Sequence, residues 1–262
     1  MYYMSSLGLF PRADAAIVSD PGRERMLTYD YLEHLLKWQE AHNGIPIIVR
    51  REKNLFDDLL NPGKEGKRFA SIPAFTMSSN SRVGMLRRQC TSEYKIRPID
   101  NAIRDLYGLT KGQRRPETTV WKGITTDELD RMDHPRQGWK THIYPFTGFY
   151  FKKEVWGRIA WGNPMSREQV VSWLKHNNFP VPVKSACVFC PYRSDSSWAD
   201  LKENYPDDFQ AAVAVDESIR NSMSKGIKNP CYLHRSLKPL SEIQFRKSQD
   251  LWAGDCSSNC HL

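Results

Sequence analysis

Apolar, strand-like runs alternate with helix-like stretches through the first half of the chain, and this alternation restricts the fold more than any other feature. Strands are predicted at 13–20, 45–51 and 118–124, and helices at 28–44 and 101–108. The first run, ADAAIVSD, is small and apolar and ends in an acid before Pro-Gly, a pattern typical of a buried strand followed by a turn. Strands that alternate with helices indicate an α/β fold with a parallel sheet.

The C-terminal part of the chain is predicted to be helical. A helix at 166–178 begins with a capping box, in which Ser166 is the N-cap and Gln169 follows three residues later. A second helix is predicted at 207–226, where the pattern ends at a glycine. No linker rich in proline, glycine or serine divides the sequence, so we expect one α/β domain over residues 1–262 with a helical C-terminal part.

Composition restricts the cellular compartment and the partners that we expect for the protein. The first residues lack a basic segment followed by a long apolar run, so no secretory signal is expected. No run of about 18 apolar residues predicts a membrane helix. Six cysteines in such a chain favour a reducing, cytoplasmic compartment and metal binding over disulfides. The net charge of +8 favours a polyanionic partner such as DNA.

The cysteines are the strongest candidates for a chemical site. Cys187 and Cys190 have the two-residue spacing with which thiolates bind one metal ion or cluster. Cys90 lies far upstream, and two more cysteines lie in the tail, DCSSNCHL. A four-thiolate site can be assembled from these residues, and spacing does not separate zinc from iron–sulfur. The alternative is a set of buried free thiols, which is the interpretation that suits the isolated Cys231.

Four segments occur in a characteristic order: IVSDPGRERMLTYDYL, RRQCTSEYKIRPI, WKGITTDELDRM and SACVFCPYR. Over residues 8 to 240 the chain resembles the phosphoadenosine-phosphosulfate (PAPS) reductase family, in its iron–sulfur branch. The resemblance implies a doubly wound, mostly parallel sheet and a 4Fe–4S cluster in the C-terminal part, residues 184–262. The cluster ligands that the resemblance implies are Cys90, Cys187 and Cys190. Some relatives have a second cysteine where this chain has Gln89, so we expect Cys260 to replace that ligand, with Cys256 as the alternative.

The sequence departs from that family where a phosphate-binding loop is expected. The family begins with a strand and a Ser-Gly-Gly loop, which would precede YYMSSLGLF in this sequence. The segment at 61–68, NPGKEGKR, has glycines and bases but no strand-to-helix context. We therefore expect either a start further upstream or a scaffold that no longer hydrolyses nucleotides. Cys260 has a second interpretation, because the reductases carry a mobile catalytic cysteine near the C-terminus.

Residues 147–163 form an insertion relative to the family, rich in aromatic and basic residues. Aromatic rings stack on bases and cations bind phosphates, so the segment is a candidate nucleic-acid surface. The alternative is a β-hairpin that packs on the body. Basic residues also exceed acidic ones over 82–140, thirteen against eight. The candidate DNA contacts are Phe151 and Trp156 for bases and Lys152, Lys153 and Arg158 for phosphates.

Three acids follow predicted strands, at the sheet edge where α/β proteins bind ligands. Asp20 ends the first strand, and Asp127 and Glu128 follow the strand at 118–124. A carboxylate there can activate water or stabilise a cationic centre. The alternative is that each of them caps a turn or a helix. His134 and His142 are expected in solvated loops.

Three functions remain open from the sequence. The favoured one is an enzyme that modifies or excises a DNA base, a glycosylase-like hydrolase, because the charge, the insertion and the lost loop point to nucleic acid. The expected setting is phage defence or phage-encoded DNA modification, because relatives of this branch resemble sulfur-transfer proteins of DNA phosphorothioation. The second is a sulfur transferase or reductase that uses a nucleotide-activated substrate. The third is a non-catalytic DNA-binding module.

Overall fold

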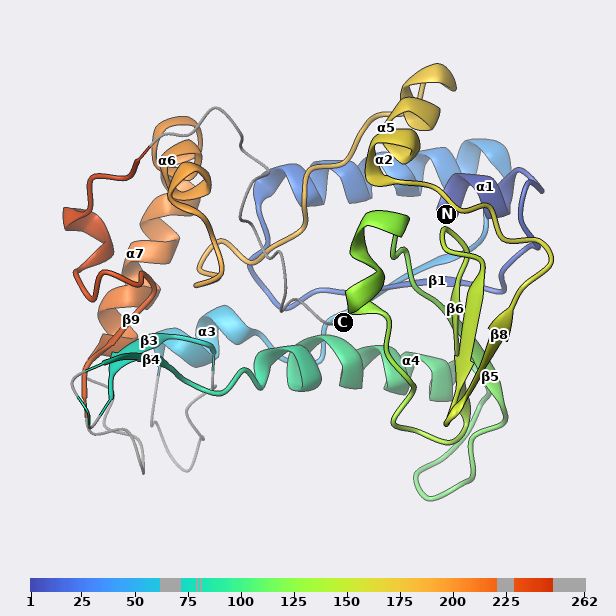
Figure 1. The fold of residues 1–262 in the computed structure, drawn as a ribbon, viewed down its shortest axis with the longest axis horizontal. Coiled ribbons are helices and arrows are strands. Elements are labelled where there is room, and N and C mark those ends of the chain that lie inside the picture. Colours follow the sequence, from blue (N-terminus) through green and yellow to red (C-terminus); the bar gives the residue numbers. More distant parts are fainter. Residues whose placement is uncertain (62–71, 79, 81, 221–228, 247–262) are drawn as a thin grey trace.

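The computed structural model describes residues 1–61, 72–78, 80, 82–220 and 229–246. Helices and strands are mixed along the chain, as the sequence predicts (Figure 1). The helices are α1 (Tyr2–Ser6), α2 (Met26–His42), α3 (Leu55–Leu60), the π-helix η1 (Thr91–Ile96), α4 (Arg97–Leu106), the 3-10 helix η2 (Thr126–Arg131), α5 (Arg167–His176), α6 (Asp195–Asn204), α7 (Pro206–Arg220) and the 3-10 helix η3 (Leu240–Glu242). The strands are β1 (Ala16–Ser19), β2 (Ile47–Arg50), β3 (Phe75–Met77), β4 (Val83–Met85), β5 (Thr118–Trp121), β6 (Lys140–Tyr144), β7 (Phe149–Lys152), β8 (Val155–Arg158) and β9 (Cys231–Tyr232).

The described strands form three sheets. β1 pairs in parallel with β2, and β5 pairs in parallel with β6. β7 and β8 extend the second of these sheets in antiparallel order, and β3 lies between β4 and β9 in a small antiparallel sheet. The two parallel pairs agree with the α/β expectation. A single doubly wound sheet stays a prediction.

Most of the elements expected from local patterns are present. α2 ends one residue before Asn43, which takes the left-handed conformation (φ 48°) and ends the helix where a glycine was expected to do so. The predicted capping box of α5 is formed in both directions between Ser166 and Gln169. The helix predicted at 207–226 corresponds to α7 as far as Arg220, and residues 221–226 lie outside the described part.

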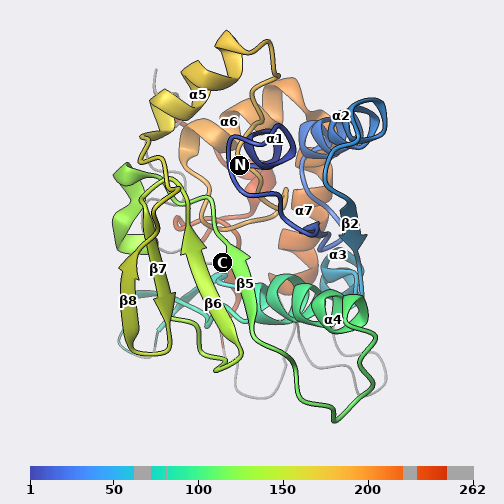
Figure 2. The same ribbon diagram turned by 90° about the vertical axis from the view of Figure 1, so that its right-hand side faces the viewer.

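The helices and sheets form two groups, one at each end of the molecule. α6, α7 and the β3–β4–β9 sheet lie at one end of the molecule, the β5–β8 sheet lies at the other, and α4 runs between them (Figures 1 and 2). The largest core cluster joins α3, α6, α7 and β9 around the fully buried Trp198 and Leu201. Trp198 therefore lies in the core.

A second core region ties the N-terminal helix to the body. Tyr3 packs with Trp38 of α2 and Leu174 of α5, and Met4 packs with Phe10 and Phe146. Each contact removes apolar surface from water, and that burial is the main favourable term in folding. Among the described helices, none has the length and apolar character needed to cross a bilayer.

Candidate functional site

The Cys187–Cys190 segment is a tight loop directly before α6. The backbone N–H of Cys190 donates to the carbonyl of Cys187 at 3.0 Å, which closes the turn. Cys187 is buried, with 8% of its surface exposed, and it forms an isolated β-bridge with Glu24. The bridge fixes the loop against the segment that follows β1, so both thiols face the protein interior.

The structure brings Cys90 to the same place. Cys90 directly precedes the π-helix η1, and it packs with Cys190 against the core cluster that contains Cys187. Burial raises the pKa of all three thiols, and the Cys190 sulfur contributes to the shift at both other cysteines. Three of the predicted ligands therefore share one buried region. Cys256 and Cys260 lie outside the described residues.

A buried ion pair lies beside these thiols and was not anticipated from the sequence. Lys95 Nζ donates to Glu24 Oε1 at 3.1 Å, and Glu24 also accepts hydrogen bonds from Ser185 Oγ at 3.0 Å and from Cys187 Sγ at 3.5 Å. Burial lowers the pKa of Lys95, but the negative charges of Cys187 and Glu24 outweigh burial and hold that pKa above its ordinary value. The positive charge of Lys95 thus offsets part of the effect of burial on the thiols, although burial dominates and their pKa values stay raised.

Arg193 fixes the cysteine loop from the other side, and it too was missed. Its guanidinium donates to three carbonyl oxygens of the loop, those of Val188 at 3.2 Å, Cys187 at 3.1 Å and Ala186 at 3.4 Å. A fourth bond reaches Ser197 Oγ at 2.9 Å in α6. A planar guanidinium suits this task because its donors form a rigid fork. The signal in the sequence was the arginine three residues after the second cysteine, within CPYR.

The thiols suit a soft metal in chemical terms. Thiolates bind zinc and iron–sulfur clusters, and Lys95 supplies a compensating charge. Over the described ranges, however, His, Cys, Asp and Glu side chains do not form any group of three with the arrangement of a metal site. The described donors are three thiols, and a four-thiolate site needs one more ligand from the tail. The 4Fe–4S cluster, and zinc as its alternative, stay predictions.

Asp20 lies at the carboxyl end of β1, as expected, and its side-chain oxygens are engaged. Oδ1 accepts from the backbone N–H of Gly22 at 2.8 Å and from Tyr29 Oη at 3.0 Å, while Oδ2 pairs with Arg51. This is the turn-capping role that the sequence left open as the alternative. An engaged carboxylate of this kind holds the loop after β1 in place.

Asp127 and Glu128 are occupied in a similar way. Asp127 Oδ1 accepts from the backbone N–H of Arg167 at 2.9 Å, so it caps the start of α5 from outside the helix. Glu128 pairs with Arg131 and, at 3.0 Å, with the guanidinium of Arg167. The two acids therefore join η2 to α5. No described contact joins Asp127 or Glu128 to Asp20.

The insertion at 147–163 contains a β-hairpin, made of β7 and β8. Phe151 packs on the body: its ring lies edge-on to Tyr144, with centroids 5.5 Å apart, and to His134 at 4.6 Å. Lys152 is paired with Glu117. These two candidate contacts therefore have structural partners, as the packed-hairpin alternative predicts.

The other three candidates of the hairpin face solvent. Trp156 is 61% exposed, and Lys153 and Arg158 are exposed at the turn and on β8. Trp156 and Arg158 lie two residues apart on one strand and so point to the same face. Phe149 lies between them, 5.8 Å from the Trp156 ring and 5.6 Å from the Arg158 guanidinium. One face of the hairpin thus offers an open ring and an adjacent cation.

A polar cluster below this hairpin corrects one expectation. His142 is buried at 5% exposure on β6, whereas the sequence suggested a solvated loop. Its Nδ1 lies 3.0 Å from the carbonyl oxygen of Asp133, and Tyr144 Oη donates to the carboxylate of Asp133 at 2.9 Å. Lys122 completes the cluster by pairing with the same carboxylate. These contacts hold the segment before β6 against the sheet.

Comparisons of the chain with protein-family models, with curated proteins and with solved structures give no match. Function therefore has to follow from the chain's own residues.

Proposed function

We propose that the protein binds DNA through the β7–β8 hairpin and modifies or excises a base, on a scaffold related to the PAPS reductases. The observation that carries this proposal is the exposed ring of Trp156 on the same strand face as Arg158. Stacking of an aromatic ring on a base contributes roughly 1–3 kcal/mol. The Trp156 ring is 61% exposed, so a base can stack on it. The adjacent cation can bind the phosphate next to that base.

The charges of the hairpin support the same partner. Lys152 is neutralised by Glu117. Lys153 and Arg158 take part in none of the ion pairs found within the described residues. Exposed cations without acidic partners contact phosphates at little desolvation cost. We therefore assign the phosphate contacts to Lys153 and Arg158, and a smaller role to Lys152.

The thiol region completes the proposal. Cys90, Cys187 and Cys190, with Cys260 or Cys256, would hold a 4Fe–4S cluster, and the two parallel strand pairs would belong to a doubly wound sheet. The support is the shared burial of the three sulfurs and the positive charge of Lys95 beside them. When bound, the cluster would fasten the cysteine loop to the start of η1. The chain's own residues, Arg193 and the Glu24 bridge, hold that loop in place.

No catalytic step is assigned to the acids proposed from the sequence, because Asp20, Asp127 and Glu128 are engaged in caps and ion pairs. The three mutually interacting thiols favour sulfur transfer or reduction as a second candidate function. A sulfur-transfer enzyme would release or accept sulfide, whereas a base-excising enzyme would leave abasic sites in DNA. Incubation of pure protein with normal and modified DNA, followed by assays for both products, separates the two.

The test of DNA binding compares two neighbouring side chains. Val155 and Trp156 are each 61% exposed on β8, but only the tryptophan has a ring to stack. Trp156→Ala should weaken binding of a single-stranded oligonucleotide by roughly ten-fold or more. Val155→Ala should leave that affinity unchanged. Fluorescence anisotropy with a labelled oligonucleotide measures both, and equal affinities for the two variants would refute the proposal.

The cations should act through the salt dependence of binding. Lys153→Ala and Arg158→Ala should each weaken binding to all sequences and reduce the slope of log affinity against log salt by roughly one unit. Lys152→Ala should change the slope less, because Glu117 already neutralises that ammonium. If all three variants keep the slope of the parent chain, the hairpin does not contact the phosphates.

A further inference from the structure

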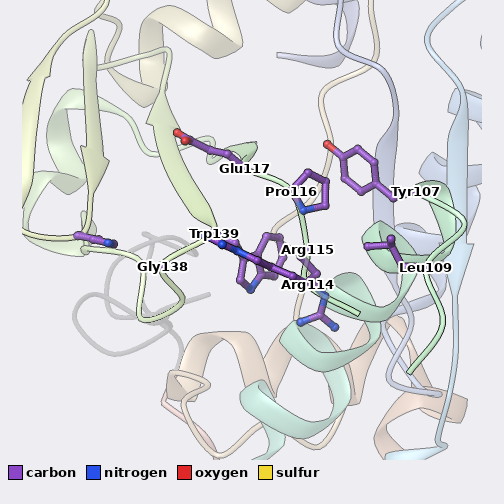
Figure 3. A pocket seen from close by; sticks show the side chains of 9 residues that line it. Tyr107, Leu109, Arg114, Arg115, Pro116, Glu117, Gly138 and Trp139 are labelled. Carbon is purple, nitrogen blue, oxygen red and sulfur yellow. The ribbon is translucent and has the colours of Figure 1, made fainter. Parts of the chain in front are cut away.

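A pocket of about 790 Å³ lies beside the tip of the hairpin, between the loop that follows α4 and the turn that precedes β6 (Figure 3). Tyr107, Arg114 and Arg115 reach it from the loop, Trp139 from the turn and Lys153 from the hairpin. Sites for small ligands typically have volumes of roughly 300–1,000 Å³. The volume is therefore that of a nucleotide-sized ligand, and none of the sequence motifs pointed to this place.

The pocket has aromatic walls with cations set against them. The Arg115 guanidinium lies 4.9 Å from the centre of the Trp139 ring, and Figure 3 shows the two side chains side by side. The Nζ of Lys140 is 5.0 Å from the same centre. Tyr107 is 47% exposed, and its hydroxyl accepts from Thr118 Oγ1 at 3.2 Å, which fixes the ring. The Tyr107 ring is thus a flat, held surface on which a planar ligand can stack.

The pocket carries a net positive charge, because its cationic side chains outnumber its acids. Arg114, Arg115 and Lys153 line it together with one acid, Glu117, which also pairs with Lys152. Nε of Arg115 is buried and has no hydrogen-bond acceptor among the described atoms. The guanidinium and ammonium groups that line the pocket favour an anionic ligand. Phosphate fits best, because guanidinium groups bind it in bidentate fashion.

We infer that this pocket binds one nucleotide, with its phosphate on Arg114, Arg115 and Lys153 and its base against the aromatic walls. The nucleotide is either free or part of a strand, and only the strand source rests on the proposed DNA binding. Lys153 belongs both to the pocket and to the hairpin. A strand that crosses the hairpin therefore passes the mouth of the pocket, where an extruded or terminal nucleotide can enter.

The test measures binding of dTMP, thymidine and inorganic phosphate to the full chain by isothermal titration calorimetry. dTMP should bind more tightly than either thymidine or phosphate, because only dTMP uses both the rings and the cations. Arg115→Gln should weaken dTMP binding by about ten-fold or more, since a charged hydrogen bond is lost. Arg114→Gln should act in the same direction. Arg136→Gln is the matched control, because Arg136 is exposed and lies outside the pocket.

Thermal melting of each variant checks that the fold is kept. The inference is overturned if dTMP shows no binding at millimolar concentration, if thymidine binds as well as dTMP, or if Arg115→Gln leaves the affinity unchanged. Trp156→Ala separates the two proposals: it should weaken oligonucleotide binding and leave dTMP binding intact. Binding of dTMP without binding of oligonucleotides refutes the proposed DNA function and supports a pocket for free nucleotides. Competition between dTMP and a 5′-phosphorylated oligonucleotide supports the strand source.

Discussion

Replacement of the buried Arg193 should destabilise the protein strongly. The side chain is 9% exposed, and its guanidinium makes four hydrogen bonds. Three of them end on carbonyl oxygens of the loop that carries Cys187 and Cys190. The guanidinium also lies 5.6 Å from the ring of the fully buried Trp198. Arg193→Ala removes all of these contacts at once.

The size of the effect follows from the acceptors left behind. Each buried polar group that loses its partner costs roughly 1–3 kcal/mol, and water entering the new space recovers part of it. Three carbonyl oxygens therefore give a loss of about 3–6 kcal/mol in the free energy of unfolding. For chains of this size, each kcal/mol lowers Tm by roughly 2–4 °C. Arg193→Lys keeps one charged donor group and should cost about half as much, because an ammonium lacks the planar fork.

Urea unfolding followed by circular dichroism gives the free energies, and differential scanning calorimetry gives Tm. Arg235 provides the control, because it is exposed and makes none of the described ion pairs. Arg235→Ala should change the free energy of unfolding by less than about 0.5 kcal/mol. A loss below about 1 kcal/mol for Arg193→Ala, or equal losses for the lysine and alanine variants, would refute the reasoning.

Three further outcomes follow from the described contacts. Phe151→Ala should lower the free energy of unfolding by about 2–3 kcal/mol, measured by urea unfolding, because a partly buried ring is lost from the contact with Tyr144; no loss would mean that the ring is not packed. Cys187→Ser should remove iron or zinc from the purified full chain, measured by elemental analysis, whereas Cys231→Ala should keep it; equal metal content would exclude Cys187 as a ligand. Burial raises the pKa of Asp133, but hydrogen bonds from His142 and Lys122 outweigh burial and hold that pKa well below its ordinary range. The carboxylate is therefore more acidic in the folded chain than in the unfolded chain, and its contribution to stability is present above about pH 4 and is lost as the pH falls further. Asp133→Asn should reduce Tm by more at pH 6 than at pH 2, because part of the contribution is already lost at the lower pH; a reduction that is equal at both values would contradict this.

Elements defined by a local pattern could be predicted from the sequence. The periodicity of α2 and the capping box of α5 each depend on residues within one segment, and the structure contains both. The sequence did not predict β6, because the strand begins with Lys140, Thr141 and His142. A polar run of this kind is typical of a loop. In the fold these side chains are buried with polar partners from elsewhere in the chain, such as Asp100 of α4 for Lys140. Pairing of that kind depends on distant residues, and local composition does not reveal it.

The same distinction applies to the candidate site. The sequence motifs, through the resemblance, placed Cys90 with Cys187 and Cys190, and the structure places all three sulfurs in one buried region. The charges around them were not foreseen. Lys95 and Glu24 are 71 residues apart in the chain, and each looks like an ordinary surface residue in its own segment. Their pairing exists only because the fold brings them together, with Glu24 buried and Lys95 partly buried.

The place of β3 between β4 and β9 sets an order of events during synthesis. Thr76 Oγ1 in β3 donates to the carbonyl of Pro230, 154 residues further along the chain. Asp216, fully buried in α7, accepts from the backbone N–H groups of Leu233 and Leu240. At roughly 5–20 residues per second, a ribosome needs on the order of 10–30 s to make the intervening segment. During that interval the edge of β3 that later pairs with β9 has no partner strand. An unpaired strand edge can pair with other chains and cause aggregation. Expression at a lower temperature slows synthesis and so lengthens this interval. Co-expression of chaperones that cover exposed strand edges should therefore raise the soluble yield more than a lower temperature does.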